Sequence, residues 1–225
     1  ILKTRIINPG DELLDELQLT GVFVYGTNEQ VSKMNTIKLA KLPGIQYEVK
    51  AIIEFPNNKT FKIKIGTNGC LGDTFLLDLF VFKLNAKVVI TSNLNISDGL
   101  ANGTKGTIRS ITEVNSEVTE IHVELDDEEC GKVTRNAQTK LVTIVKKQAI
   151  YTTSGQGITI PIYQFPLKLM YASTIHKMQG VTVKKPTPLI IDMATIWTGC
   201  PSLAYVAFSR VQTLNHCSKW AIHEY

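Results

Sequence analysis

The stretch Tyr171-Ala-Ser-Thr-Ile-His-Lys-Met-Gln-Gly-Val-Thr182 carries the strongest structural signal in this chain. Residues 167–172 are mostly apolar, which predicts a strand buried inside a sheet. Ser173 or Thr174 can then cap a short helix that Gly180 ends. Hydroxyl, imidazole, ammonium and amide groups thus follow a strand directly, as in polyanion sites of open α/β sheets. A capped turn without any ligand would explain the same residues.

The composition is that of an ordinary globular protein. The chain has 225 residues, of which 44% are hydrophobic and 20% are charged, so it holds one large domain or two small ones. No apolar run approaches the ~20 residues that cross a bilayer, and the amino terminus has no signal-peptide core. Because the chain begins with Ile1 rather than Met, we expect it to be a piece of a longer protein.

Cysteine and charge patterns limit the compartment and the partners. Four cysteines lie far apart in the sequence: Cys70, Cys130, Cys200 and Cys217. They form no C-x-x-C pair, so we expect reduced thiols in an intracellular protein rather than a zinc or redox motif. The net charge of +4 is compatible with nucleic-acid binding but is common in other proteins too. The pairs Lys146-Lys147 and Lys184-Lys185 are more often solvated surface than phosphate ligands.

The first forty residues have an α/β pattern. Leucines at helical spacing run from Pro9 to Leu19, and Val22 to Tyr25 reads as a short buried strand. Thr27 can then form a capping box with Gln30 at the start of a helix that Pro43-Gly44 ends. The order is therefore strand, polar turn and helix.

The middle of the chain is rich in short strands. A hairpin is expected around Pro56-Asn-Asn-Lys59, between strands at 47–55 and 61–65. Further strands are expected at 86–91, 107–111, 121–125, 141–145 and 158–163. Hydrophobic residues alternate strictly in the strand from Ile121 to Leu125, so it should be half-buried. Many short strands with glycine-containing turns predict a small barrel or sandwich.

From Pro166 onward the α/β pattern returns. A buried strand is expected at 188–192, a helix from Pro201 to Arg210 and a final strand at 219–222. An α/β domain interrupted by a β insertion explains all three parts of the chain.

Several common site motifs are absent from the sequence. It contains no G-x-x-x-x-G-K-[ST], no H-E-x-x-H and no G-x-S-x-G, and its histidines lack metal-ligand spacing, so we expect no metal site. His122, His216 and His223 read as surface or structural residues. Arg210 alone could be a C-terminal cation that interacts with a helix dipole. Together with the polar stretch 171–182, Arg210 becomes a candidate residue for binding an anion.

Four segments resemble motifs of the Pif/RecD-like superfamily 1 DNA helicases. Residues 165–182 look like motif V, and Ala204-Tyr-Val-Ala-Phe-Ser-Arg-Val211 looks like motif VI. Residues 24–35 resemble motif IV, and residues 84–106 resemble the segment that leads into the inserted barrel of the family. The segments occur in the family's order, from about residue 22 to 215.

The resemblance implies an α/β fold with a RecA-like parallel sheet. Residues 1–80 and 166–225 would form the second RecA-like lobe (domain 2A), and residues 81–165 a small Src-homology-type β-barrel inserted into it (domain 2B). The first RecA-like lobe, which carries the phosphate loop, would lie upstream in the same polypeptide. The implied function is the second motor lobe of an ATP-dependent 5′→3′ helicase in DNA repair and recombination.

The resemblance also implies the ligands and their residues. Arg210 matches the catalytic arginine finger, and Gln179 and Gly180 match positions beside the ATP, which with Mg is bound mainly by the first lobe. The partners would be single-stranded DNA and the first lobe, and the protein would be a monomer, nuclear if eukaryotic. The positions that would face DNA are Thr27, Asn28, Asn93, Asn102, Thr174, His176 and Lys177.

The sequence departs from the family pattern at two packing positions. Met178 stands where Ser is common, and Phe208 stands where Leu is common; residues 45–74 have no clear counterpart. Two other functions fit the sequence: a non-enzymatic single-stranded nucleic-acid-binding module derived from a helicase, and a protein-interaction domain that uses the barrel. Gln179 and Arg210 together favour the motor, because a module that only binds DNA has no use for an arginine finger.

Overall fold

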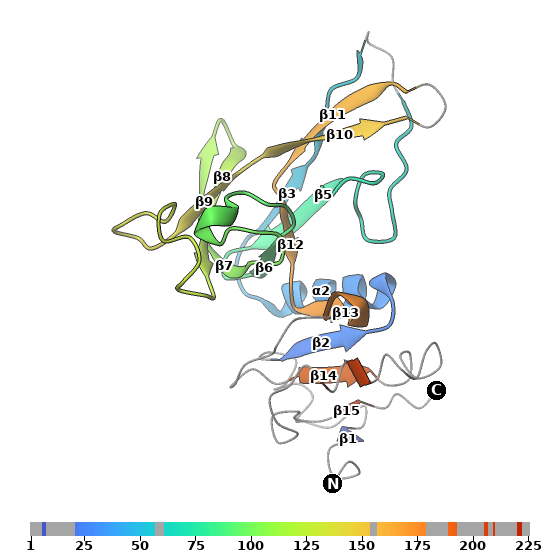
Figure 1. Ribbon diagram of the computed structural model, residues 1–225, viewed down its shortest axis with the longest axis vertical. Helices are drawn as coiled ribbons and strands as arrows, with labels where there is room; N and C mark the ends of the chain where they lie inside the picture. Colours follow the sequence, from blue (N-terminus) through green and yellow to red (C-terminus); the bar gives the residue numbers. More distant parts are fainter. Residues whose placement is uncertain are drawn as a thin grey trace. The chain divides into compact units, whose positions relative to one another are not determined.

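The chain forms two compact units in a computed structural model (Figure 1). The structure describes residues 6–7, 21–56, 61–153, 157–178, 189–192, 205–206, 209 and 220–221. Unit 1 combines residues 1–41 and 170–225, and unit 2 is the continuous segment 42–169. Residues 42–80, which we expected in the α/β domain, therefore group with the β-rich segment.

Unit 1 is built on a parallel sheet. Neighbouring strands are parallel throughout the order β1-β15-β14-β2-β13. The expected strands at 22–25, 188–192 and 219–222 are confirmed. The strands of this sheet are β1 (Ile6–Ile7), β15 (Trp220–Ala221), β14 (Leu189–Asp192), β2 (Val22–Tyr25) and β13 (Ala172–Thr174).

Helix α2 (Asn28–Lys41) follows β2 and packs on this sheet. The amide of Gln30 donates to the Thr27 hydroxyl at 3.4 Å, which confirms Thr27 as the helix cap. The Thr27 hydroxyl in turn donates to Gln30 Oε1 at 3.0 Å. The helix ends at Lys41, and Gly44 then takes a φ of +109°, which a residue without a Cβ adopts at little cost.

Two helices expected in unit 1 fall mainly outside the described residues. The one expected between Pro9 and Leu19 lies wholly outside them. Within the one expected between Pro201 and Arg210, Tyr205 and Val206 are helical, and Ser209 N donates to Tyr205 O at 3.0 Å, the spacing of an α-helical turn.

Unit 2 contains three antiparallel sheets in its described residues (Figure 1). The largest has the order β12-β6-β7-β8-β9: Leu167–Leu169, Lys87–Ile90, Lys105–Val114, Glu117–Leu125 and Val142–Val145. The second has the order β10-β11-β4: Lys147–Thr152, Thr159–Gln164 and Ile52–Ile53. The third pairs β3 (Gln46–Lys50) with β5 (Leu79–Lys83). Together with unit 1, these sheets make a mixed α/β fold.

The main core of unit 2 joins the largest sheet to the β3-β5 pair. Phe80 and Phe82 from β5 are buried there with Ile108 and Ile121 from β7 and β8. The expected strands at 86–91, 107–111, 121–125, 141–145 and 158–163 are confirmed, and in β8 Ile121, Val123 and Leu125 are buried while Glu124 is exposed. Strands β5 and β10 were not predicted.

The hairpin expected around Pro56 is wrong. β3 pairs with β5 and β4 pairs with β11, whereas residues 61–64 lie in no strand and Ile65 makes only an isolated bridge to Leu71. The turn at 57–60 lies outside the described residues. Ile63 packs on a small core with Leu71. Residues 61–65 alternate between apolar and lysine side chains, and this pattern reflects side-chain packing rather than strand pairing.

The single strand expected at 167–172 is also wrong, because the chain changes sheets within it. β12 pairs antiparallel with β6 in unit 2, and β13 pairs parallel with β2 in unit 1. An apolar run reports burial but does not identify the partner strand. The helix after it is a 3-10 turn, η4 (Ile175–Met178), and the expected end at Gly180 lies outside the described residues.

Candidate nucleic-acid interface at the carboxyl edge of the parallel sheet

Polar side chains of unit 1 gather where three parallel strands end. The register pairs Thr174 of β13 with Tyr25 of β2, and Ile191 of β14 with Val24. The carboxyl ends of the strands therefore meet at one edge of the sheet, where open α/β sheets bind their ligands. β2 leads into the Thr27 turn, and β13 leads into η4 with His176.

The exposure of these residues separates surface groups from packed ones. Thr27, His176 and Lys177 are exposed, and Asn28 is half-buried at the first position of α2. Thr174 is only 7% exposed, so its side chain offers little surface to a ligand. The structure therefore brings exposed hydroxyl, imidazole and ammonium groups to one edge, with Thr174 packed beneath them.

A buried carboxylate at this edge was missed by the sequence analysis. Asp192 ends β14 with 6% of its surface exposed, and Gln30 Nε2 donates to its Oδ2 at 3.4 Å. Burial, and secondly the charge of Asp192, raise the pKa of the Tyr25 phenol well above its ordinary range. An acidic residue ending the apolar strand Leu189–Asp192 was the available signal, because a buried charge requires polar partners.

Two candidate DNA ligands lie together in unit 2. Asn102 N donates to Asn93 Oδ1 at 2.9 Å, and both residues are exposed. Lys147 Nζ donates to the carbonyl of Asn93 at 2.6 Å. The loop after β6 is therefore held by one of its own side chains, Asn93, and by Lys147 of β10.

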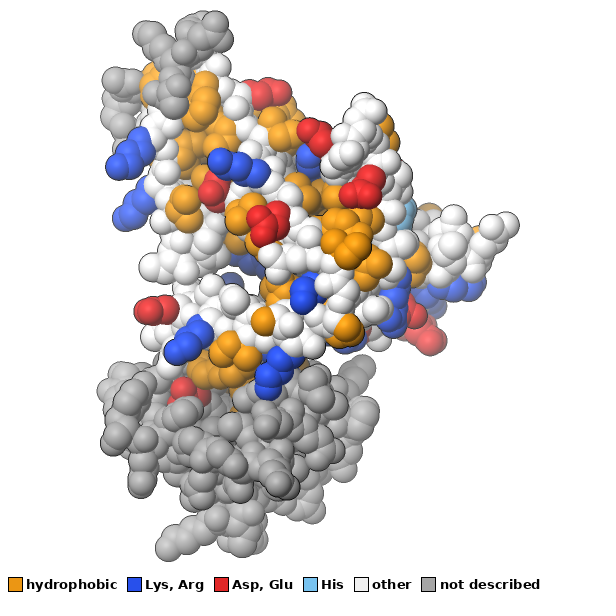
Figure 2. All heavy atoms as spheres, turned by 180° about the vertical axis from the view of Figure 1, so that it is seen from behind, with side chains coloured by type: hydrophobic (Ala, Val, Ile, Leu, Met, Phe, Trp, Pro, Cys, Tyr) orange, Lys and Arg blue, Asp and Glu red, His pale blue; other side chains and the backbone are white. Residues whose placement is uncertain are grey.

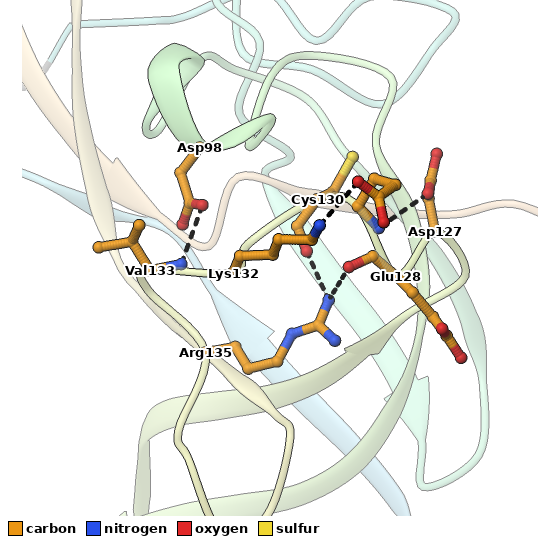
Figure 3. A network of polar contacts seen from close by, with 8 residues as sticks. Asp98, Asp127, Glu128, Cys130, Lys132, Val133 and Arg135 are labelled. Atoms are coloured by element: carbon orange, nitrogen blue, oxygen red, sulfur yellow. Dashed lines mark hydrogen bonds and ion pairs between the residues drawn. The ribbon is translucent and has the colours of Figure 1, made fainter.

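A second polar network anchors the same loop (Figure 3). Asp98, in the 3-10 turn η3 (Ile96–Asp98), accepts a hydrogen bond from the amide of Val133 at 3.0 Å. It accepts another from the amide of Thr134 at 2.8 Å. These amides, Val133 first, hold the pKa of the buried Asp98 carboxyl below its usual value. Arg135 donates to the carbonyl oxygens of Cys130 and Glu128 within the same connection between β8 and β9.

Charge on unit 2 is mixed rather than concentrated on the face shown in Figure 2. Basic and acidic side chains alternate there with exposed hydrophobic ones. Exposed pairs such as Lys87 with Asp126 and Lys132 with Glu129 neutralise each other locally. On this face of unit 2, binding of a polyanion would therefore depend on particular side chains more than on a broad positive field.

The residues expected at the nucleotide lie outside the described part of the chain. These are Gln179, Gly180 and Arg210. Among the described side chains, no group of three or more His, Cys, Asp and Glu could hold a metal ion. His122 has a structural setting, with its ring nitrogens 2.9 Å from Thr112 Oγ1 and 3.0 Å from Thr143 Oγ1. No helix in the described ranges has the length and apolar character that a bilayer crossing requires.

The curated relatives are ATP-dependent DNA helicases. No protein-family model matches the chain. It is 26% identical over 186 residues to the ATP-dependent DNA helicase PIF1 of Danio rerio, covering 83% of this chain and 25% of the relative. It is 24% identical over 194 residues to Pif1 of Bdellovibrio bacteriovorus, covering 86% and 37%. It is 26% identical over 225 residues to human PIF1, covering 93% of this chain and 30% of the relative.

Solved Pif1 structures share the fold of the chain. The Pif1 helicase from Candida albicans aligns with a TM-score of 0.64 at 20% identity, covering 96% of this chain and 50% of that one. Bacteroides Pif1 bound to ssDNA aligns with a TM-score of 0.57 at 21% identity, covering 89% and 40%. The mixed α/β architecture therefore matches part of a Pif1 helicase.

The chain is thus similar in sequence and fold to a portion of superfamily 1 helicases. The particular relatives are Pif1 helicases, along most of this chain's length, and the resemblance seen in the four motifs is confirmed. Across all the curated relatives that it matches, the chain spans 25% to 42% of the relative's length.

Proposed function

We propose that the chain is the second motor lobe of an ATP-dependent 5′→3′ DNA helicase. Unit 1 would be its RecA-like lobe (domain 2A), and unit 2 would contain the Src-homology-type barrel (domain 2B). One observation carries the proposal: the parallel sheet brings the Thr27 turn of motif IV and the His176-Lys177 turn of motif V to the same edge.

The chemistry of this edge suits a single strand of DNA. The first amides of α2, beside the Thr27 hydroxyl that caps the helix, can donate to a phosphate at the positive end of the helix dipole. Lys177 supplies a cation and His176 a ring that can stack or donate. Asn93 and Asn102 would add amide contacts from unit 2. The shared fold of Bacteroides Pif1, solved with ssDNA, supports this assignment.

ATP turnover would require residues of this chain and of a first lobe. Arg210 would supply an arginine finger, because its planar and permanent charge suits the spread negative charge of phosphoryl transfer. Gln179 and Gly180 would approach the phosphates with an amide and a backbone N–H. The sequence has no phosphate loop and spans 25% to 42% of its relatives, so ATP and Mg would be held mainly by a first lobe elsewhere in the polypeptide.

The proposed setting is an intracellular, reducing one, where the protein would act as a monomer in DNA repair and recombination. Cys70 and Cys130 are free thiols in the structure, which supports this compartment.

The experiment replaces Arg210 in the polypeptide that carries both lobes. Arg210→Ala should lower DNA-stimulated ATP hydrolysis by about 10³-fold or more, because a finger contributes about that much. Binding of a labelled oligothymidine should stay within about threefold of wild type, since Arg210 would face the nucleotide. Arg109→Ala, which removes an exposed arginine paired with Glu124, is the matched control and should leave both quantities unchanged.

Two outcomes would replace the proposal. Turnover near wild type in Arg210→Ala would remove the finger assignment. A wild-type polypeptide that binds the oligonucleotide tightly but does not hydrolyse ATP would identify a non-enzymatic nucleic-acid-binding module instead.

A further inference from the structure

The chain enters β13 through a break in its backbone hydrogen bonding. Leu169 is the last residue of β12 and pairs with Val88, and Ala172 is the first residue of β13 and pairs with Phe23. Backbone N–H groups between two sheets need partners that neither ladder supplies. Tyr171 O accepts from Phe23 N at 3.1 Å, so the carbonyl at the break is satisfied by β2.

Asn35 supplies the missing acceptor for the N–H groups. Its Oδ1 accepts hydrogen bonds from Tyr171 N and from Ala172 N, each at 3.0 Å. The donors are 136 and 137 residues away from Asn35 in the sequence, and all three residues are at least half-buried. One side-chain oxygen therefore holds two consecutive backbone N–H groups at the start of β13.

The same helix holds Tyr171 and Ala172 in other ways. Lys38, one turn after Asn35, places Nζ 4.9 Å from the ring centre of Phe23 and 5.8 Å from that of Tyr171. Met34 packs against the small core that contains Ala172. Helix α2 and the start of β13 therefore behave as one rigid piece.

This piece links the two halves of the proposed DNA edge. α2 begins directly after Thr27, and β13 ends two residues before His176. A shift of β13 along α2 would change the distance between the Thr27 turn and the His176-Lys177 turn. In the proposed function both turns contact phosphates of one strand, so their separation has to suit the spacing of phosphates along it.

We propose that Asn35 is a positioning residue that sets the register of β13 against α2 and so matches the two halves of the edge to a DNA strand. The inference rests on the proposed function. A residue with only a structural role would change the stability of unit 1 but not the number of phosphates that the folded protein contacts.

The test measures binding of the whole 225-residue chain to a labelled oligothymidine as a function of salt concentration. Each phosphate contact on a single strand contributes about 0.7 to the slope of log K against log salt. Asn35→Leu removes the acceptor at similar size, so it should weaken binding by about tenfold and lower the slope by about 0.7 per lost contact. Asn35→Asp keeps an oxygen in the same place and should retain the wild-type slope.

Two further variants make the result interpretable. Thr36→Ala is the matched control, since Thr36 is exposed on the same helix and its hydroxyl bonds locally to Ser32 O at 3.1 Å. If Asn35→Leu does not fold, Asn35→Ser serves instead, because its side chain is too short to reach both amides. The double variant His176→Ala with Lys177→Ala tests the edge itself.

The outcomes separate this inference from the function on which it rests. A folded Asn35→Leu (or Asn35→Ser) protein with wild-type affinity and slope, beside weakened binding by the His176 and Lys177 variant, would overturn the role of Asn35 alone. Wild-type binding by the His176 and Lys177 variant would overturn the DNA edge, and the role of Asn35 with it. Equal loss of slope in Asn35→Leu and Asn35→Asp would also contradict the acceptor argument.

Discussion

At the residue scale, the most unusual side chain of unit 1 is a buried lysine. Lys38 is 5% exposed, and among the described atoms its Nζ has no hydrogen-bond partner. Burial, and secondly the charge of Lys41, lower its pKa from 10.5 to about 8. Contact with the ring of Phe23 offsets part of the cost of burying the charge.

The lowered pKa predicts a particular pH dependence of stability. The unfolded chain binds a proton on Lys38 up to pH 10.5 and the folded chain only to about pH 8, so the free energy of unfolding should rise with pH between these values. Lys38→Met should remove this rise and stabilise the protein at neutral pH by about 1 kcal/mol. Urea unfolding followed by tryptophan fluorescence reports unit 1, since both tryptophans lie after residue 170.

Lys33→Met, on the exposed side of the same helix, is the control. An equal rise with pH in the Lys38→Met and wild-type proteins would contradict the assignment.

At the element scale, the sequence predicted which elements exist better than it predicted their partners. The strand Val22–Tyr25 and its Thr27 cap follow from local patterns, because apolar runs and capping residues act over a few positions. At the break of the run 167–172, the N–H of Tyr171 donates to Asn35, a contact that spans 136 residues. Local periodicity contains no information on such a contact.

The candidate site was predictable to the same extent. His176 and Lys177 follow a recognisable strand end, and the structure places them at the sheet edge beside the Thr27 turn. The hydrogen bond between Gln30 and Asp192 was missed because it joins residues 162 positions apart. Side chains that act by orienting others leave little trace in a single sequence.

Glycine at position 106 is required by the pairing of β7 with β8. A Cβ there would lie 2.5 Å from the carbonyl oxygen of Glu124, and that carbonyl is fixed in β8. Gly106→Ala should therefore destabilise the protein by about 3 kcal/mol. At Gly103 a Cβ would meet nothing within 4 Å, and only the φ of +100° is unfavourable, so Gly103→Ala should cost about 1 kcal/mol. Equal losses in chemical unfolding would exclude crowding as the cause.

The hydrogen bonds from the amides of Val133 and Thr134 to Asp98, called here the Asp98 clasp, should be sensitive to acid. The pKa of the Asp98 carboxyl is lower in the folded protein than the ordinary 3.8. The contribution of Asp98 to the free energy of unfolding is therefore present above that pH and is lost as pH falls further. In wild type, amide hydrogen exchange at Val133 and Thr134 should accelerate, after correction for intrinsic rates, as pH drops below 3.8. In Asp98→Asn these amides should already exchange fast at neutral pH, with little further acid effect. Identical protection in both proteins would contradict the clasp.

At the scale of the whole molecule, the chain has two compact units and similarity to only part of each helicase relative. Unit 2 has its own core, and unit 1 presents the proposed DNA edge. The chain spans 25% to 42% of those relatives, and its sequence has no phosphate loop. We therefore expect a lobe of this kind to bind a strand, while ATP and Mg are held mainly by a first lobe.

The most direct measurement is ATP hydrolysis by the purified 225-residue chain with excess single-stranded DNA, beside a longer polypeptide that carries a first RecA-like lobe. If the chain is half of a motor, it binds the DNA but hydrolyses ATP no faster than buffer, while the longer polypeptide shows DNA-stimulated turnover. ATP turnover by the chain alone, at a rate comparable with that of the longer polypeptide, would contradict the central claim.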